Sequence, residues 1–290
     1  HKLPGYRQGR REQFEYHQAN PLPHALVIVD EASMPYSSLM HHLLAAVRHD
    51  AEILLVGDPD QLASVDAGTV LGDLATFATP ECATNPLQGC IETLTECHRT
   101  ESKTILELGA AIRAGEAAHA AAILEAGGGQ VAWVDPANKQ QLLILTDEVV
   151  AHARTLRQQA RGGDAAGVLA VQAQLQVLCG HRQGQMGVSG WNSRVERQLD
   201  LRPGFPWYTG RPVMVTRNNR ALRLANGDIG VVMADSDRRR AVFGSVNTAG
   251  EPLQLPVARL EDVETVHALT IHKSQGSEYG HVVVVLPERA

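Results

Sequence analysis

Two adjacent carboxylates, Asp30 and Glu31, end the apolar run Ala25–Val29. Five apolar residues without alternation are typical of a parallel strand covered on both faces, and ligands of such sheets bind at the carboxyl ends of the strands. An aspartate there can hold Mg²⁺ beside a nucleoside triphosphate, and an adjacent acid can polarise the attacking water. By itself such a pair is more often the acidic start of a helix, so its neighbours must decide.

A second apolar run, Ile53–Val56, also ends in an acid, Asp58, and Gln61 follows after a short turn. A glutamine amide in this place can donate to a γ-phosphate and accept from the attacking water. A lone loop glutamine is usually only solvated. The small and turn-forming residues of 57–73 would let the backbone approach a ligand closely.

The elements between these acids decide whether they meet. Apolar residues within Ser38–Arg48 recur at helical spacing, and Ser37 is a plausible N-cap. Strand, helix and strand within about thirty residues form a βαβ unit, whose two strands run parallel and end at one edge. We therefore expect Asp30, Glu31 and Gln61 to share a site.

Further elements are predicted along the chain from periodicity and turn residues. They are a helix over 105–112, a helix over 139–157, a strand over 175–179 and a helix capped by Asn192 or Ser193 with Glu196 in the capping-box position. Short β-prone runs follow at 212–216, 228–233, 241–246 and 253–257, and an apolar strand closes the chain at 282–286. The β-prone runs predict a small antiparallel barrel that is inserted into an α/β domain.

Composition sets the class of protein. The chain has 290 residues, of which 44% are hydrophobic and 20% charged, as expected for a soluble chain of about two domains. No apolar run approaches the ~20 residues of a membrane span and no signal pattern occurs, which indicates an intracellular protein. Four cysteines without C-x-x-C spacing indicate reduced thiols. A net charge of −6 gives no support for nucleic-acid binding, and the arginines at 7, 10 and 11 are compatible with either a nucleic-acid patch or a solvated loop.

Four motifs together resemble those of superfamily 1 DNA helicases. They match motifs II, III, IV and V in order and spacing: Val29–Ser33, Gly57–Leu62, His98–Arg99 and Thr270–Glu278. The His-Lys-Ser-Gln-Gly-Ser-Glu form is that of the 5′-to-3′ branch. Asp60–Asp73, with Arg211–Met214 and Asn226–Gly230, is similar to the alpha-subunit family of exodeoxyribonuclease V. The resemblance covers nearly the whole chain.

The resemblance implies a role for each matched residue. Asp30 would hold Mg²⁺, Glu31 would activate water, Gln61 would sense the γ-phosphate, and Arg99 would reach that phosphate from the opposing lobe. Two further positions would face the nucleotide: Gly276 and Glu278. The DNA strand would be contacted by Ser64, Val65, Thr270, His272, Lys273 and Ser274.

The implied fold is α/β, with two RecA-like lobes of the P-loop NTPase type built on parallel sheets, the first incomplete, and an inserted SH3-like β-barrel. Residues 1–97 would be the end of the first lobe, 98–206 and 262–290 the second lobe, and 207–261 the barrel. No Gly-Lys pair of a phosphate-binding loop occurs. The chain is therefore expected to be an internal fragment that neither hydrolyses ATP nor unwinds DNA by itself.

The implied function is that of an ATP- and Mg²⁺-dependent 5′-to-3′ DNA helicase in double-strand-break repair and recombination. Its partners would be single-stranded DNA, duplex ends and the beta and gamma subunits of exodeoxyribonuclease V, in the bacterial cytoplasm at the nucleoid. No membrane partner is expected.

Other interpretations of these residues stay open. Arg99 could form a surface ion pair with Glu96 or Glu101, His98 and His272 could be packed histidines, and Lys273 could be solvated. The chain as a whole could be a non-catalytic module that binds DNA or a partner subunit. It could also be the helicase domain of a conjugative relaxase, although Asp60–Val65 fits that interpretation poorly.

Overall fold

The computed structural model describes residues 14–61, 70–77, 87, 89–98, 100–128, 130–201, 206–235, 238–246 and 251–287. The chain forms two compact units, His1–Trp133 and Val134–Ala290. The division falls later in the chain than the predicted lobe boundary at 97/98, and the predicted domain limits stay predictions.

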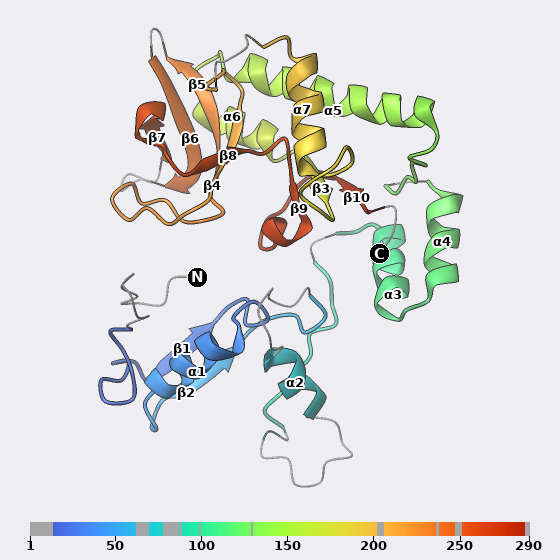
Figure 1. The fold of residues 1–290 in the computed structure, drawn as a ribbon. Helices are drawn as coiled ribbons and strands as arrows, with labels where there is room; N and C mark the ends of the chain where they lie inside the picture. Colours follow the sequence, from blue (N-terminus) through green and yellow to red (C-terminus); the bar gives the residue numbers. More distant parts are fainter. Residues whose placement is uncertain are drawn as a thin grey trace. The chain divides into compact units, whose positions relative to one another are not determined.

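The first unit is organised around two parallel strands. Its elements, shown in Figure 1, are β1 (Leu26–Val29), α1 (Ser37–Ala46), β2 (Glu52–Leu55), α2 (Val70–Phe77), α3 (Lys103–Arg113) and α4 (Ala117–Ala126). β1 and β2 pair from Leu26 with Glu52 to Val29 with Leu55. The predicted strand–helix–strand unit with parallel strands is thus confirmed.

Helix α1 covers one face of this sheet. Met40, Leu43 and Ala46 are buried at three-residue spacing and form a cluster with Val27 and Val29 of β1. The prediction that Ser37 caps α1 is wrong, because Tyr36 is the N-cap residue and Ser37 is already helical. Helices α3 and α4 pack on each other.

The second unit holds a parallel sheet with strand order β10-β3-β9. Its α/β elements are α5 (Lys139–Gln159), α6 (Ala165–Gln172), β3 (Leu175–Cys179), α7 (Val188–Gln198), β9 (Ala268–Thr270), η2 (Ile271–Ser274) and β10 (His281–Val285). The central strand, β3, is buried at all five residues. Its core is shared with α5 through Val149 and Val150 and with α7 through Trp191 and Val195.

Two predictions for the second unit need correction. Neither Asn192 nor Ser193 caps α7, because this helix begins at Val188 with Gly187 at its N-cap, so Asn192 lies inside it. The glycine-punctuated loop hid this earlier start. Helix α6 was not predicted, and a short apolar stretch of eight residues gives too little periodicity to separate helix from strand.

The inserted β-region is a five-stranded antiparallel sheet of order β7-β6-β5-β4-β8. The strands are β4 (Pro212–Val215), β5 (Ile229–Asp235), β6 (Arg238–Val246), β7 (Pro252–Pro256) and β8 (Val263–Thr265), with η1 (Val257–Arg259) between the last two. All four predicted β-prone runs are strands. The expected barrel is seen as an open sheet, since no pairing between β7 and β8 occurs among the described residues. None of the described helices combines the length and the apolar composition that a membrane span requires.

Candidate functional site

In the first unit the carboxyl ends of β1 and β2 are tied together by main-chain hydrogen bonds. The amide of Val56 donates to the carbonyl of Val29 at 2.8 Å, and the amide of Ala32 donates back to the carbonyl of Val56 at 2.8 Å. These two bonds extend the pairing past the ends of both strands. Asp30 and Glu31 therefore lie at the same sheet edge as the segment that begins at Gly57.

Gly57 is required at this edge by close approach of the two chains. A Cβ at this position would lie 2.8 Å from Cδ2 of Leu71, 3.0 Å from the amide nitrogen of Ala32 and 3.1 Å from that of Ser33. Backbone atoms cannot give way as a flexible side chain can. The glycine thus lets the two strand ends meet without a gap.

Glu31 turns the chain out of the sheet in a conformation rare for a side-chain-bearing residue. Its φ is +53°, in the left-handed region that costs an L-residue about 1 kcal/mol or more. The Glu31 amide donates to Oδ1 of Asp30 at 2.9 Å, and its carbonyl accepts from the amide of Met34 at 3.0 Å. Strain at a residue of this kind is a feature found at functional sites.

The second strand end forms a turn that fixes Gln61. Oδ1 of Asp58 accepts from the amide of Asp60 at 3.0 Å, and the Asp58 carbonyl accepts from the amide of Gln61 at 3.2 Å. Asp58 therefore holds the turn, and Gln61 is half-buried beside it. The prediction that the two acidic strand ends share an edge is confirmed, while the roles of Asp30, Glu31 and Gln61 stay predictions.

The chemistry of this edge suits a metal that takes most of its ligands from elsewhere. Among the described residues no group of three or more His, Cys, Asp or Glu side chains could hold a metal ion. Mg²⁺ needs no such group, because it keeps several waters and binds through one or two carboxylates together with substrate phosphates. The exposed carboxylate of Asp30 fits that requirement.

Three predicted site residues lie outside the described residues: Ser64, Val65 and Arg99. The neighbour of Arg99, His98, is exposed, and its Nε2 lies 3.7 Å from Oε2 of Glu96. This exposure does not fit the alternative interpretation of His98 as a packed histidine.

In the second unit the predicted strand-binding residues follow β9 without a break. Thr270 ends β9, and η2 carries His272, Lys273 and Ser274. The Ser274 hydroxyl donates to the carbonyl of Ile271 at 2.7 Å, which closes this short helix on itself. Gly276 then takes a φ of +74°, a conformation that glycine adopts without strain.

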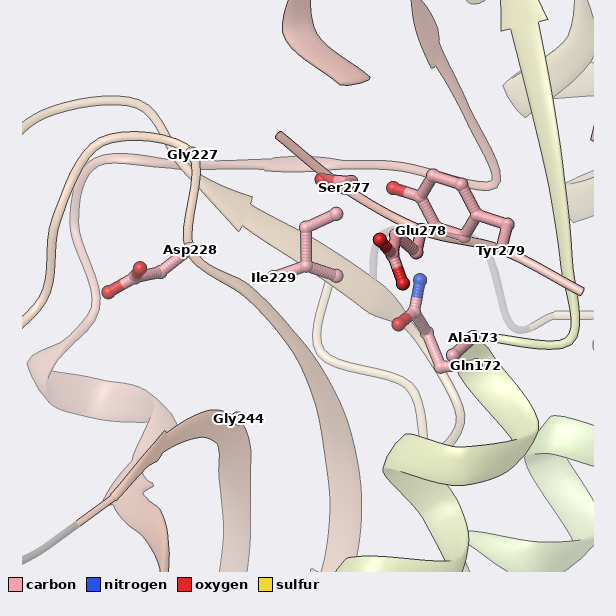
Figure 2. Close-up of a pocket in the computed structure, with 9 residues that line it drawn as sticks. All are labelled: Gln172, Ala173, Gly227, Asp228, Ile229, Gly244, Ser277, Glu278 and Tyr279. Atoms are coloured by element: carbon pink, nitrogen blue, oxygen red, sulfur yellow. The ribbon is translucent and has the colours of Figure 1, made fainter. Parts of the chain in front are cut away.

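Glu278 lies on the wall of a cavity of about 320 Å³ in the second unit (Figure 2). Ser277, Glu278 and Tyr279 line it together with residues of the antiparallel sheet and the end of α6: Gln172, Ala173, Gly227, Asp228, Ile229 and Gly244. The motif segment is thus packed beside the inserted sheet. Its predicted contact with a nucleotide stays a prediction.

The connector between β8 and β9, Val266–His267, joins the inserted sheet to the motif strand and is held by two side-chain amides. Nε2 of Gln176 in β3 donates to the carbonyls of Val266 at 3.3 Å and His267 at 3.1 Å. From α7, Nδ2 of Asn192 donates to the carbonyl of Thr265 at 3.1 Å, and its Oδ1 accepts from the amide of Ala268 at 2.9 Å. Each amide satisfies main-chain groups that β8 and β9 leave unpaired at their ends.

A chain of buried polar groups fixes the connector from a second side. Nε2 of His267 lies 2.8 Å from the hydroxyl of Tyr208, which donates to Oε1 of Glu196 at 3.0 Å. Because the Tyr208 hydroxyl donates its hydrogen to Glu196, its oxygen accepts from His267. The hydrogen of a neutral His267 therefore lies on Nε2. Burial lowers the pKa of His267 to about 3, with nearby His152 and Arg211 acting in the same direction. Burial likewise raises the pKa of Tyr208.

Sequence reasoning missed these holding residues. Gln176 had a visible signal, since it is the polar residue in an otherwise apolar strand, Leu175–Cys179. Asn192 and Tyr208 had none, because the residues that they bind at the connector, Thr265 and His267, are more than fifty residues away along the chain. The buried thiol of Cys179, whose pKa burial raises to about 11, agrees with the expectation of an unreactive, reduced cysteine.

Comparison with known proteins shows what the chain is similar to. Residues 6–136 match the AAA domain family. Over 291 residues the chain is 45% identical to the RecBCD enzyme subunit RecD of Mycolicibacterium smegmatis, covering 99% of this chain and 49% of that protein. The chain is a homologue of RecD. The RecD of Mycobacterium tuberculosis strain H37Rv is 41% identical over 296 residues, with 99% and 48% covered.

The RecD homology extends over the whole chain, and the chain spans about half the length of these RecD relatives. Among solved structures, a Bacteroides Pif1 helicase crystallised with ADP-AlF3 and single-stranded DNA is similar in fold, with a TM-score of 0.51, 16% identity, and 97% of this chain and 69% of that chain covered. This likeness concerns the fold alone, which is α/β with parallel sheets and an antiparallel five-stranded sheet.

Proposed function

We propose that this chain forms part of the motor of an ATP-dependent 5′-to-3′ DNA helicase, the alpha subunit of a RecBCD-type exodeoxyribonuclease V. Its partners are the beta and gamma subunits, single-stranded DNA and duplex ends, and its role lies in double-strand-break repair and recombination in the bacterial cytoplasm. Support comes from RecD homology over the whole chain and from the motif order in the sequence.

One observation carries the proposal most directly. Parallel pairing of β1 and β2, extended by the Ala32–Val56 hydrogen bond, brings Asp30, Glu31 and Gln61 to one sheet edge. If Asp30 and Glu31 served only as the acidic start of a helix, no second strand end would have to pack beside them. Here Gly57, after β2, lies close to the amides of Ala32 and Ser33. The carboxyl edge of a parallel sheet is where nucleotides bind in this class of fold.

The proposed chemistry divides among the residues of this edge. Asp30 would hold Mg²⁺, which when bound neutralises charge on the β- and γ-phosphates. Glu31 accepts a proton from the attacking water, and the Gln61 amide orients that water. Arg99 stabilises charge that develops on the γ-phosphate, and Gly276 and Glu278 contact the nucleotide from the second lobe.

The DNA strand is bound by residues at the carboxyl edge of the second sheet. Thr270, His272, Lys273 and Ser274 contact phosphates there, and Ser64 and Val65 add contacts from the first lobe. Such contacts tolerate any sequence and weaken as salt rises. In this assignment residues 207–261, which hold strands β4 to β7 of the antiparallel sheet, are the SH3-like insert, residues 1–97 belong to the first lobe, and 98–206 with 262–290 form the second.

A matched pair of variants tests the catalytic assignment in the RecD-type subunit assembled with its beta and gamma partners. Glu31→Gln should lower DNA-stimulated ATP turnover by about 10²-fold or more, because it removes the general base. Glu52→Gln, at the opposite end of β2, should leave turnover unchanged. Near-normal turnover by Glu31→Gln, with DNA and nucleotide binding intact, would show that another group activates the water.

Loss of Arg99 gives an independent check. Arg99→Ala should slow turnover by about 10³-fold, as expected for an arginine that stabilises transferring phosphate, and nucleotide binding should persist. Arg113→Ala, at the end of α3, serves as a control. Equal effects of the two substitutions would refute the assignment of Arg99.

A further inference from the structure

One carboxylate in the second unit holds two cations at the edge where the DNA strand is proposed to bind. Nζ of Lys273 pairs with Oε1 of Glu264, and Nη2 of Arg182 pairs with Oε2 of the same carboxylate at 3.1 Å. Three separate segments meet here: η2, β8 and the loop after β3. Of the three residues, Lys273 alone belongs to the motif Thr270–Glu278.

The sheet register explains why Arg182 reaches the same edge as Lys273. β3 and β9 are adjacent and parallel, with Cys179 paired to Thr270. Arg182 follows Cys179 by three residues, as Lys273 follows Thr270. Both cations therefore leave the sheet at equivalent points of neighbouring strands, next to each other at its carboxyl end.

Glu264 comes from the inserted sheet, where it lies opposite Met214 on β4. Its position is fixed at both ends of β8. The amide of Thr216 donates to the carbonyl of Asp262 at 2.9 Å before the strand, and Asn192 binds the carbonyl of Thr265 after it. The carboxylate is thus held at a defined place between the two cations.

The arrangement has the chemistry of an occupied phosphate site. Two nitrogen donors of positive charge face separate oxygens of one anion, and a backbone phosphate offers oxygens of the same kind. The cluster carries one net positive charge. The Arg182 side chain is 64% exposed, while those of Lys273 and Glu264 are 31% and 30% exposed, so solvent and a strand can reach the donors. Ion pairs this exposed contribute little to stability, which makes the exchange of one anion for another easy.

We propose that Arg182 is a second phosphate-binding residue beside Lys273, and that Glu264 acts as a stand-in anion that a DNA backbone phosphate displaces. In the absence of DNA, Glu264 keeps both cations extended toward the strand path. When a strand binds, its phosphate takes over the Lys273 and Arg182 contacts. This inference rests on the proposed function, because it requires that Lys273 face the DNA strand.

If Glu264 acts as a stand-in anion, removing its charge and removing the charge of Lys273 or Arg182 should change DNA affinity in opposite directions. Removing the charge of Glu264 takes away a competitor of the phosphate, so DNA binding becomes tighter. Removing the charge of Arg182 or Lys273 takes away a phosphate contact, so binding becomes weaker and its dependence on salt becomes less steep.

The test measures binding of a fluorescent oligo-dT strand by anisotropy, without nucleotide, over a series of NaCl concentrations. We expect Arg182→Gln to weaken binding about tenfold and to reduce the slope of log K against log[NaCl] by about 0.7, the change expected for one lost contact to a single strand. Glu264→Gln should strengthen binding several-fold. Arg161→Gln, at an exposed position just after α5, and Glu148→Gln on α5 are the matched controls and should change neither quantity.

The outcomes separate this inference from the function on which it rests. If Lys273→Gln weakens binding and Arg182→Gln does not, the inference fails and the proposed function stands. If Glu264→Gln weakens binding, with Glu264→Asp restoring it, the carboxylate is required for the site and the stand-in role is overturned. Failure of the unaltered protein to bind oligo-dT, or of Lys273→Gln to weaken binding, overturns both.

Discussion

The parallel strands β1 and β3 have similar sequences but lie in different surroundings. Every residue of β3 is buried, whereas Leu26 and Ile28 of β1 are 50% and 60% exposed. β3 is flanked by β9 and β10 and covered by α5 and α7. In the described part of the first unit β1 pairs with β2 alone, and the core cluster at this sheet contains residues of α1 together with Val70 and Leu71 of α2.

The difference shows that an apolar run indicates only that a strand can be buried. How much of the strand is buried depends on the strands and helices packed around it. The two sheets also differ in their polar residues. Exposed carboxylates follow β1 and β2, with a strained turn at Glu31, while the connector before β9 is held by side-chain amides and by the buried histidine His267. The first sheet thus ends in acidic side chains that can take part in a reaction. In the second sheet, the polar side chains hold the main chain that leads into the motif segment.

The largest expected effect separates the two strands with one type of substitution. Leu178→Ala in β3 should lower the free energy of unfolding by about 3 kcal/mol, because Leu178 is 8% exposed and its removal leaves a cavity. Leu26→Ala in β1 should cost less than about 1 kcal/mol, because half of that side chain is already in solvent. Urea denaturation with hydrogen exchange read by peptide mass spectrometry measures each strand separately.

Equal losses in the two variants would break the comparison. They would mean that Leu26 is covered in the protein as it exists in solution, and exchange protection of β1 comparable to that of β3 would accompany them. Protection confined to β3 supports the difference described.

The next effect concerns the connector. Asn192→Ala should cost about 2 kcal/mol, because it leaves the carbonyl of Thr265 and the amide of Ala268 without their side-chain partner. Asn218→Ala is the control, since Asn218 also binds a main-chain amide, that of Asn226 at 2.8 Å, but on an exposed loop. A cost for Asn192→Ala no larger than that for Asn218→Ala would show that the connector does not need its amide clamp.

Acid should destabilise the second unit through His267. Its pKa is about 3 in the folded protein because of burial, against about 6.5 when unfolded. Between these values the unfolded chain binds more protons, so stability is lost as pH falls below about 6.5, by about 2 kcal/mol at pH 5. His152, whose pKa burial also lowers, adds in the same direction.

The contribution of His267 is isolated by comparing urea unfolding at pH 7 and pH 5 in the unaltered protein and in His267→Gln. The variant loses part of the pH dependence while Tyr208, Glu196 and Arg211 remain in place around the site. An unchanged pH dependence in His267→Gln would assign the acid sensitivity to other groups.

Much of the framework could be predicted from local pattern. β3 was predicted at its observed limits, and β4 to β7 were each predicted to within a few residues, because strand runs between turn residues are local signals. The placement of Asp30 and Asp58 at one sheet edge followed from the parallel βαβ rule. The start of α7 at Val188 could not be predicted, because the glycines before it read as a loop.

The holding contacts of the second unit could not be predicted for a different reason. Glu264 is one acid among many in the sequence, and its pairing with Lys273 and Arg182 depends on the register of β8 against β4 and of β9 against β3. Asn192 was expected to cap a helix and instead binds residues more than seventy positions away. Such partners follow from tertiary packing, which no window of sequence contains.

The smallest stability effect, and the one that sharpens the comparison most, is expected at the strained turn of the first sheet. Glu31→Gly should leave the free energy of unfolding within about 1 kcal/mol of the unaltered value and on the more stable side, because glycine adopts a φ of +53° without strain. Under the proposed function the same change should lower ATP turnover by about 10²-fold or more. Asp200→Gly, at another left-handed position with φ of +48°, is the control and should alter stability alike while leaving turnover intact. A stabilised, inactive Glu31→Gly beside a stabilised, active Asp200→Gly would show that the first sheet keeps a glutamate in this conformation for chemistry. A loss of stability in Glu31→Gly would instead show that the side chain is needed to hold the turn.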